Sequence, residues 1–104
     1  MVYKLVYTAR FRKNYWACLD YLEKVLENYQ AMIAVAKDVE ETLAELAKSA
    51  DFYSILENKK LNKRGIRRIR LKHHRYKIFF RIEGDTVYVV NILHNLQDYK
   101  NVLK

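Results

Sequence analysis

The spacing of apolar residues changes once along this chain, near Gly65, and this change limits the folds open to it. Over most of residues 9–47, apolar side chains recur every three or four residues, and after Gly65 they alternate with polar ones. The first spacing puts one face of a helix against a core, and the second does the same for one face of a strand. The sequence therefore predicts an α+β domain in which a helical part precedes most of the strands.

The helical part is expected to be a hairpin that follows a short N-terminal strand over residues 2–7. Thr8 is a good N-cap for a first helix that starts at Ala9. The apolar stripe of this helix loses its phase around residues 28–30, and a second stripe covers residues 32–47. Residues 49–64 lack a clear period and are expected to form a loop held by scattered apolar side chains.

Three strands are predicted after Gly65, over residues 66–72, 75–82 and 85–93, and they should form a continuous antiparallel meander. Gly84 lies in the tight turn between the last two strands, where its freedom to adopt a positive φ suits a hairpin. His73 and His74 form the turn between the first two. The expected fold is thus a strand, a helical hairpin and a three-stranded meander in a single domain of residues 1–104.

Several function classes are excluded by composition. Apolar residues make up 51% of the 104 residues, which is enough for a core, but no apolar run approaches the roughly 18 residues of a membrane span. The N-terminus lacks a signal-peptide pattern, so we expect a cytoplasmic protein without membrane contact. The single cysteine, Cys18, excludes an internal disulfide, and no Cys/His spacing suggests zinc. With only two glycines and no Gly-rich phosphate loop, we expect neither cofactor nor metal.

Positive charge is concentrated in residues 59–81. This segment holds 11 of the 20 basic residues and no acid, which leaves the rest of the chain with nine basic residues against twelve acidic ones. A mildly acidic scaffold with one basic segment favours a polyanionic or acidic partner. The alternative is a solvated strand whose charges serve solubility.

Strand alternation predicts that six of these cations share one face of the sheet: Arg68, Arg70, Lys72, Arg75, Lys77 and Arg81. Ile69, Leu71, Ile78 and Phe80 would pack on the helices, while the opposite face would carry Phe79 among cations. Guanidinium groups bind phosphates and an aromatic ring stacks on bases. The candidate nucleic-acid contacts are Arg67, Lys72, Arg75, Phe79 and Arg81, beside the central cations Arg68, Arg70 and Lys77.

The last part of the chain carries a family resemblance. Residues 66–103 read IRRIRLKHHRYKIFFRIEGDTVYVVNILHNLQDYKNVL. A basic strand, the pattern Tyr-x-Ile-Phe-Phe-x-Ile, a Glu-Gly-Asp turn, a Val/Tyr-rich strand and an Ile-Leu-His ending followed by Asp98-Tyr99 resemble the RelE/ParE toxins of bacterial type II toxin–antitoxin modules. The earlier strand and hairpin fit the same topology but carry no signature of their own.

The resemblance implies a helical hairpin packed on a twisted, mainly antiparallel sheet, and a labile antitoxin that wraps the toxin. It also implies one of two activities that inhibit growth. One branch of the family cleaves messenger RNA in the ribosomal A site without a metal, and the other poisons DNA gyrase. Both branches imply a cognate antitoxin, encoded beside the toxin gene, as in plasmid-stabilisation modules.

The resemblance to the cleaving branch rests on three cations. The catalytic basic residues of that branch lie on the strand pair that here carries Arg68, Arg70 and Lys77. His94 and Tyr99 are the candidates for acid and base, with His73 and His74 behind them. Plainer roles stay open: His94 as a hydrogen-bonding residue at a strand end, and Tyr99 as a packing residue of the tail. Where the family usually follows its histidine with Gly-Arg-Arg, this chain has Asn95-Leu96-Gln97, so an arginine for the scissile phosphate is missing.

These residues favour a metal-independent, ribosome-dependent mRNA endoribonuclease that inhibits translation. The competing hypothesis is a non-enzymatic, ParE-type inhibitor of DNA gyrase that grips its target with the basic face and the helical hairpin. A weaker third hypothesis is an inactive relative that survives as the partner of a DNA-binding antitoxin.

Overall fold

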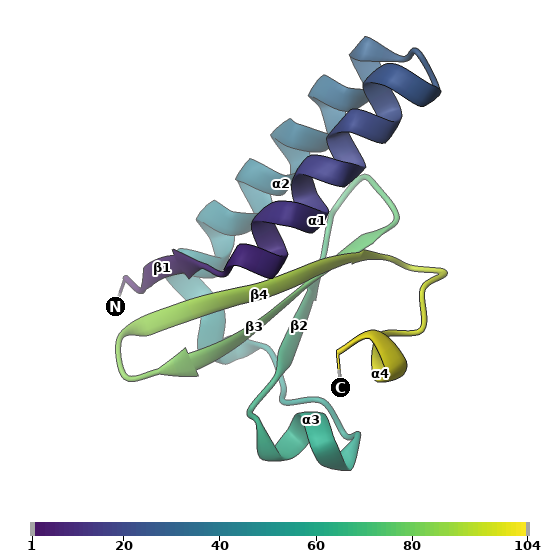
Figure 1. The fold of residues 1–104 in the computed structure, drawn as a ribbon. Coiled ribbons are helices and arrows are strands. Elements are labelled where there is room, and N and C mark those ends of the chain that lie inside the picture. Colours follow the sequence, from purple (N-terminus) through teal and green to yellow (C-terminus); the bar gives the residue numbers. More distant parts are fainter. Residues whose placement is uncertain (1, 104) are drawn as a thin grey trace.

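A four-stranded sheet forms the centre of the computed structural model, which describes residues 2–103. Its strands are β1 (Lys4–Tyr7), β2 (Arg67–Arg70), β3 (Tyr76–Glu83) and β4 (Thr86–His94), in the order β1-β4-β3-β2. The last three form the predicted antiparallel meander, and β1 pairs with β4 in parallel at one edge. Figure 1 shows the helical hairpin lying across this sheet, which confirms the predicted α+β fold.

The hairpin consists of α1 (Ala9–Asp20), a π-helical turn η1 (Tyr21–Val25) and α2 (Tyr29–Ser49). The predicted cap is confirmed, because Thr8 Oγ1 accepts a hydrogen bond from the Phe11 N–H at 3.2 Å. Asn28 caps α2 in the same way by accepting from the Ala31 N–H at 3.0 Å, so α2 begins three residues earlier than its apolar stripe indicates. The π-helical turn leaves no trace in the apolar spacing and was not predicted.

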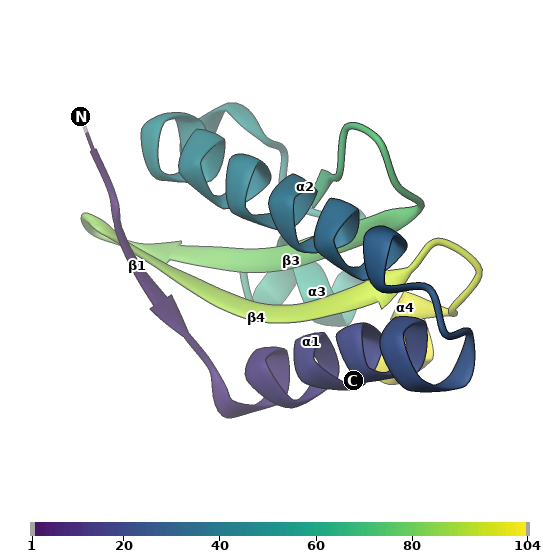
Figure 2. The same ribbon diagram turned by 90° about the horizontal axis from the view of Figure 1, so that it is seen from above.

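The main core lies between the hairpin and one face of the sheet. Phe11, Val39 and Leu46 from the helices meet Ile78 and Phe80 from β3, and all are buried. Figure 2 shows both helices of the hairpin on this side, with the strands beneath them. Burying one such side chain contributes about 1.5–3 kcal/mol, so this layer is a large source of stability for the domain.

The prediction that residues 49–64 form a loop is wrong in part. They contain a 3-10 turn η2 (Ala50–Phe52) and a short helix α3 (Lys59–Lys63), in which only Leu61 is buried. A five-residue helix is too short to show a period, and its cap, Asn58 Oδ1 accepting from the Leu61 N–H, is the only local signal.

A second core covers the other face of the sheet, beneath α3 and the C-terminal helix α4 (Tyr99–Val102). Its buried members are Leu56, Leu61, Ile66, Phe79, Leu93 and Leu103. Arg64 Nη1 donates a hydrogen bond to the Leu103 carbonyl and so ties the tail to α3. The meander is therefore covered on both faces. Within residues 2–103, no helix is long and apolar enough to cross a membrane.

Candidate functional site

The predicted basic face of the sheet is not open. Phe79 is fully buried in the second core, and Lys77 is only 9% exposed. The expectation that Phe79 stacks on a base is therefore wrong, as is the placement of Lys77 on a solvent-facing surface. Alternation along β3 correctly separates the two faces, but it cannot show that two short helices cover the second one.

Two cations and an aromatic ring meet where the first residue of α4 faces β2 and β3, and we call Arg68, Lys77 and Tyr99 the cation–tyrosine cluster. Lys77 Nζ is 5.4 Å from the centroid of the Tyr99 ring, and Arg68 Cζ is 5.7 Å from it. The Tyr99 ring also contacts Phe79, with centroids 5.5 Å apart. These cation–π contacts stabilise charges that are partly removed from water.

Arg70 extends this cluster along β2, because it pairs with Lys77 across the two strands and stays exposed. The pKa of Lys77 is lowered from its usual value, first by burial and then by the positive charges of Arg68 and Arg70. Both causes act against the ammonium form. Lys77 therefore gives up its proton more readily than a surface lysine, which is a property of lysines that move protons.

His94 lies on the opposite face of the sheet from the cation–tyrosine cluster. It pairs with Tyr76 across β3 and β4, whereas Lys77 pairs with Leu93, so the two side chains alternate to different sides. The ring of His94 is 5.2 Å from that of Tyr76. Its Nδ1 accepts a hydrogen bond from the Leu96 N–H at 3.1 Å. The structure thus divides the five predicted catalytic residues and leaves His94 outside the group.

The other predicted nucleic-acid contacts also separate. Arg67 is half-buried and donates from Nη1 to the carbonyls of Tyr53, at 2.6 Å, and Asp51, at 3.4 Å, which gives it a structural role. Arg81 lies 4.2 Å from the ring centroid of Tyr88 and pairs with a glutamate of its own strand. The predicted cations that stay fully on the surface are Arg70, Lys72 and Arg75.

His73 and His74 belong to a different contact, which the sequence did not reveal. Asp38 of α2 accepts from the His73 N–H at 2.9 Å, and its Oδ2 lies 2.7 Å from His74 Nδ1. The side chain of Asp38 is 1% exposed. The sequence held one indication that Asp38 is buried, because it lies on the same helical face as Val35 and Thr42, which are both buried.

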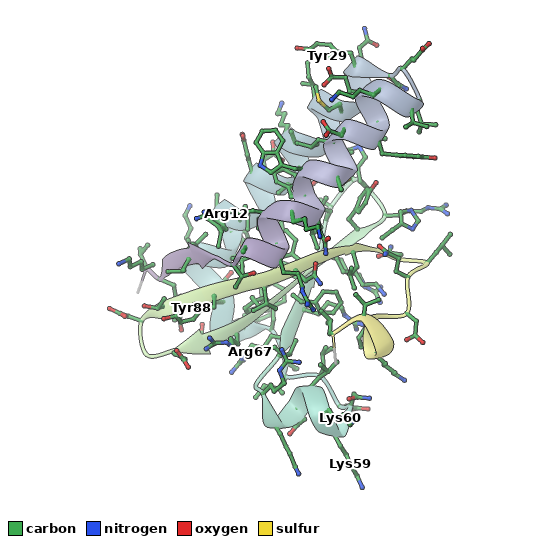
Figure 3. All side chains as sticks on the ribbon, viewed as in Figure 1. Arg12, Tyr29, Lys59, Lys60, Arg67 and Tyr88 are labelled. Carbon is green, nitrogen blue, oxygen red and sulfur yellow. The ribbon has the colours of Figure 1, made fainter. Side chains whose placement is uncertain are left out.

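Large apolar side chains are exposed along the hairpin from the second half of α1 to the first turns of α2. We call this group the hairpin patch: Trp16, Tyr21, Val25, Leu26, Tyr29 and Ile33. Figure 1 shows α1 and α2 extending past the strands, and Figure 3 places Tyr29 at this far end. The apolar stripes of the two helices are longer than the sheet that covers them. Exposed apolar patches of this kind mark protein interaction sites.

A metal centre is not suggested by the side chains of residues 2–103, because they include no group of three or more His, Cys, Asp or Glu residues placed to hold an ion.

Comparison with known proteins identifies the family. The model of the ParE toxin of the type II toxin–antitoxin system, parDE, matches residues 5–99. No curated relative matches the sequence. Among solved structures, a chain of the "Chromosomal ParDE TA system from P. aeruginosa" shares the fold, with a TM-score of 0.73 and 19% identity over 89% of this chain and 96% of that one. The chain therefore belongs to the family of ParE toxins of type II toxin–antitoxin systems.

Proposed function

We propose that this toxin arrests growth by binding DNA gyrase in the cytoplasm, without cleaving RNA. The observation that carries the proposal is the burial of Lys77 beneath Tyr99, with His94 on the other face of the sheet. Metal-free RNA cleavage needs a base, an acid and a phosphate clamp that converge on one accessible point. An inhibitor that acts by binding needs no such convergence.

The hairpin patch is the surface that we propose for gyrase. It combines three aromatic side chains, Trp16, Tyr21 and Tyr29, whose exposed fractions are 66%, 52% and 61%. Tryptophan and tyrosine dominate the binding energy of many protein interfaces, since they bury a large area with few rotatable bonds. A surface of this kind supports binding to a protein target.

We further propose a cognate antitoxin, encoded by an adjacent gene, that neutralises the toxin through an acidic or amphipathic segment. Arg70, Lys72 and Arg75 stay exposed at one end of the sheet and offer such a segment its cationic contacts. Because exposed charge pairs are screened over about 8–10 Å at physiological salt, affinity should fall as salt rises. Binding that is indifferent to salt, with no contact to these cations or to the hairpin patch, would count against this part of the proposal.

Cleavage of ribosome-bound mRNA is the second candidate function, and the cation–tyrosine cluster favours it. Arg68 and Lys77 both lie against the Tyr99 ring, and the pKa of Lys77 is lowered by burial and by its cationic neighbours. Lys77 is only 9% exposed, so a phosphate would have little of its side chain to contact. The two candidate functions therefore differ in whether Lys77 is needed.

The test is expression of the toxin and three variants in cells, followed by primer extension on transcripts and a supercoiling assay with purified gyrase. Lys77→Met keeps the length of the side chain and removes its charge. The double variant Trp16→Ala with Tyr29→Ala removes two aromatic rings from the hairpin patch. Phe52→Ala is its control, because Phe52 is an aromatic residue that is 83% exposed on a different element.

We expect the wild type to inhibit supercoiling while transcripts stay intact, Lys77→Met and Phe52→Ala to remain toxic, and the double variant to lose toxicity. Losing two aromatic contacts of an interface commonly weakens binding by about 2–4 kcal/mol or more. Transcripts cut by the wild type and spared by Lys77→Met would refute gyrase binding and support mRNA cleavage.

A further inference from the structure

One side of α1 carries a stripe of exposed residues that the fold leaves uncovered. Arg12, Trp16 and Asp20 are spaced four residues apart, so their side chains lie one above another on the same face of the helix. Trp16 is 66% exposed at the middle of this stripe, whereas its neighbour Tyr15 packs against the main core. Ala17, beside Trp16, is also exposed and is small enough to let another helix approach closely. A large apolar ring is therefore flanked by a cation on one side and an acid on the other.

Charge along this helix runs against its own dipole. Residues 9–13 hold three cations and no acid, and residues 20–23 hold two acids and no cation. Helices are more stable with acids at the N-terminus and cations at the C-terminus. Arg12 forms no salt bridge within residues 2–103, and Asp20 has one contact of 3.8 Å with Lys24, in which both side chains are more than half exposed. Both ends of α1 are therefore open to charges of the opposite sign, and a copy of the same helix running in the opposite direction supplies them.

We propose that the toxin alone forms a symmetric dimer in which α1 of one copy packs antiparallel on α1 of the other. Arg12 lies four residues, or about 6 Å, before Trp16 along the helix axis, and Asp20 lies the same distance after it. A two-fold axis at Trp16 therefore brings Arg12 of each copy opposite Asp20 of the other. It also brings the two Trp16 rings together between these two ion pairs. Such a patch is complementary to itself, which is what a two-fold interface requires.

The area of this contact predicts a weak dimer. Trp16 and Tyr21 are 66% and 52% exposed, and Val25 continues the apolar surface beyond them at 65%. An aromatic side chain buries about 150–250 Å² when it is fully covered, so the four rings of two copies contribute several hundred Å². Stable interfaces need about 1,200 Å² or more. A second copy would compete with gyrase for Trp16 and Tyr21, and only this consequence rests on the proposed function.

The test is sedimentation equilibrium of the purified full chain over a range of protein concentrations and at low and high salt. Arg12→Glu and Asp20→Arg each place two pairs of like charges opposite one another, and the double variant Arg12→Glu with Asp20→Arg restores opposite charges with the net charge unchanged. Trp16→Ala removes the central ring. Lys60→Glu is the matched control for Arg12→Glu, because it makes the same change of net charge at an exposed residue of α3, far from α1 (Figure 3).

We expect a dimer whose affinity falls as salt rises, because exposed charge pairs are screened. Arg12→Glu, Asp20→Arg and Trp16→Ala should each weaken it at least about tenfold, since like charges or the loss of the central ring remove the contacts that hold it. The double variant should return to within about threefold of the wild-type affinity, and Lys60→Glu should match the wild type. A monomer at every concentration would overturn the proposal and leave this face to a different protein. A dimer that ignores the single changes, or that the double variant does not restore, would overturn it as well.

Discussion

Replacing Asp38 with alanine should destabilise the domain more than any other removal of a charge from the hairpin. Asp38 Oδ2 accepts from the His73 N–H and contacts His74 Nδ1 at 2.7 Å, and these contacts hold the turn between β2 and β3 against α2. The carboxylate is almost fully buried, and its Oδ1 has no hydrogen-bond partner. Loss of Asp38 therefore frees the turn from the helix.

The magnitude follows from these contacts. Hydrogen bonds to a charged group contribute about 1.5–3 kcal/mol each, and burial of the unpaired Oδ1 offsets about 1–3 kcal/mol of the sum. The Asp38→Ala variant should thus lose about 2–4 kcal/mol of its free energy of unfolding. For a domain of this size, such a loss lowers Tm by roughly 10–20 °C.

The same contacts predict a pH dependence. Burial alone would raise the pKa of Asp38, but the hydrogen bonds from His74 and from the backbone N–H of His73 outweigh it, so the pKa is lowered from its ordinary value. The stabilisation is present above the unfolded pKa of about 4 and is lost as pH falls through the lower folded value. The Asp38→Asn variant lacks this titration, so its stability deficit should shrink between about pH 5 and about pH 2.

Urea unfolding of wild type, Asp38→Ala and Asp38→Asn across this pH range measures both effects. Glu41→Gln is the matched control, since Glu41 is an exposed acid on the same helix, and it should change stability by less than about 0.5 kcal/mol. An Asp38→Ala variant within about 0.5 kcal/mol of wild type would refute the reasoning. So would an Asp38→Asn deficit that stays constant as pH falls.

Three further predictions concern other parts of the fold. Lys77→Met should leave the free energy of unfolding unchanged or raise it by up to about 1 kcal/mol, because it removes a buried charge; a clear loss in urea unfolding would contradict this. Thr8→Ala should cost about 1–2 kcal/mol by the same measurement, since it removes the cap of α1, while Thr8→Ser should keep most of that stability. Burial raises the pKa of Cys18 and the hydrogen bond with Tyr76 offsets only part of this, so iodoacetamide should alkylate the folded protein more slowly than the unfolded one; equal rates would show an open thiol.

The elements of this protein were largely determined by its sequence. The change of apolar spacing at Gly65 placed a helical hairpin before an antiparallel meander, Thr8 capped α1, and the turn at Gly84, where φ is +61°, joined β3 to β4. Each of these features is local. The one buried face of a helix or strand leaves a period in the sequence, and a cap or a tight turn depends on the few residues that form it. The meander also carried the resemblance that led to the toxin family.

Only the tertiary structure decided which surfaces are open. Two helices of five and four residues cover the second face of the sheet and bury Lys77 and Phe79, yet neither helix is long enough to leave a period. The hairpin extends beyond the sheet, so Tyr29 is exposed at its far end (Figure 3), and Trp16 is exposed although its neighbours Tyr15 and Leu19 pack on the main core. Asp38 meets His74 across 36 residues of sequence. Periodicity shows which face of a helix or strand carries the apolar side chains. Whether another element covers that face depends on how distant parts of the chain pack.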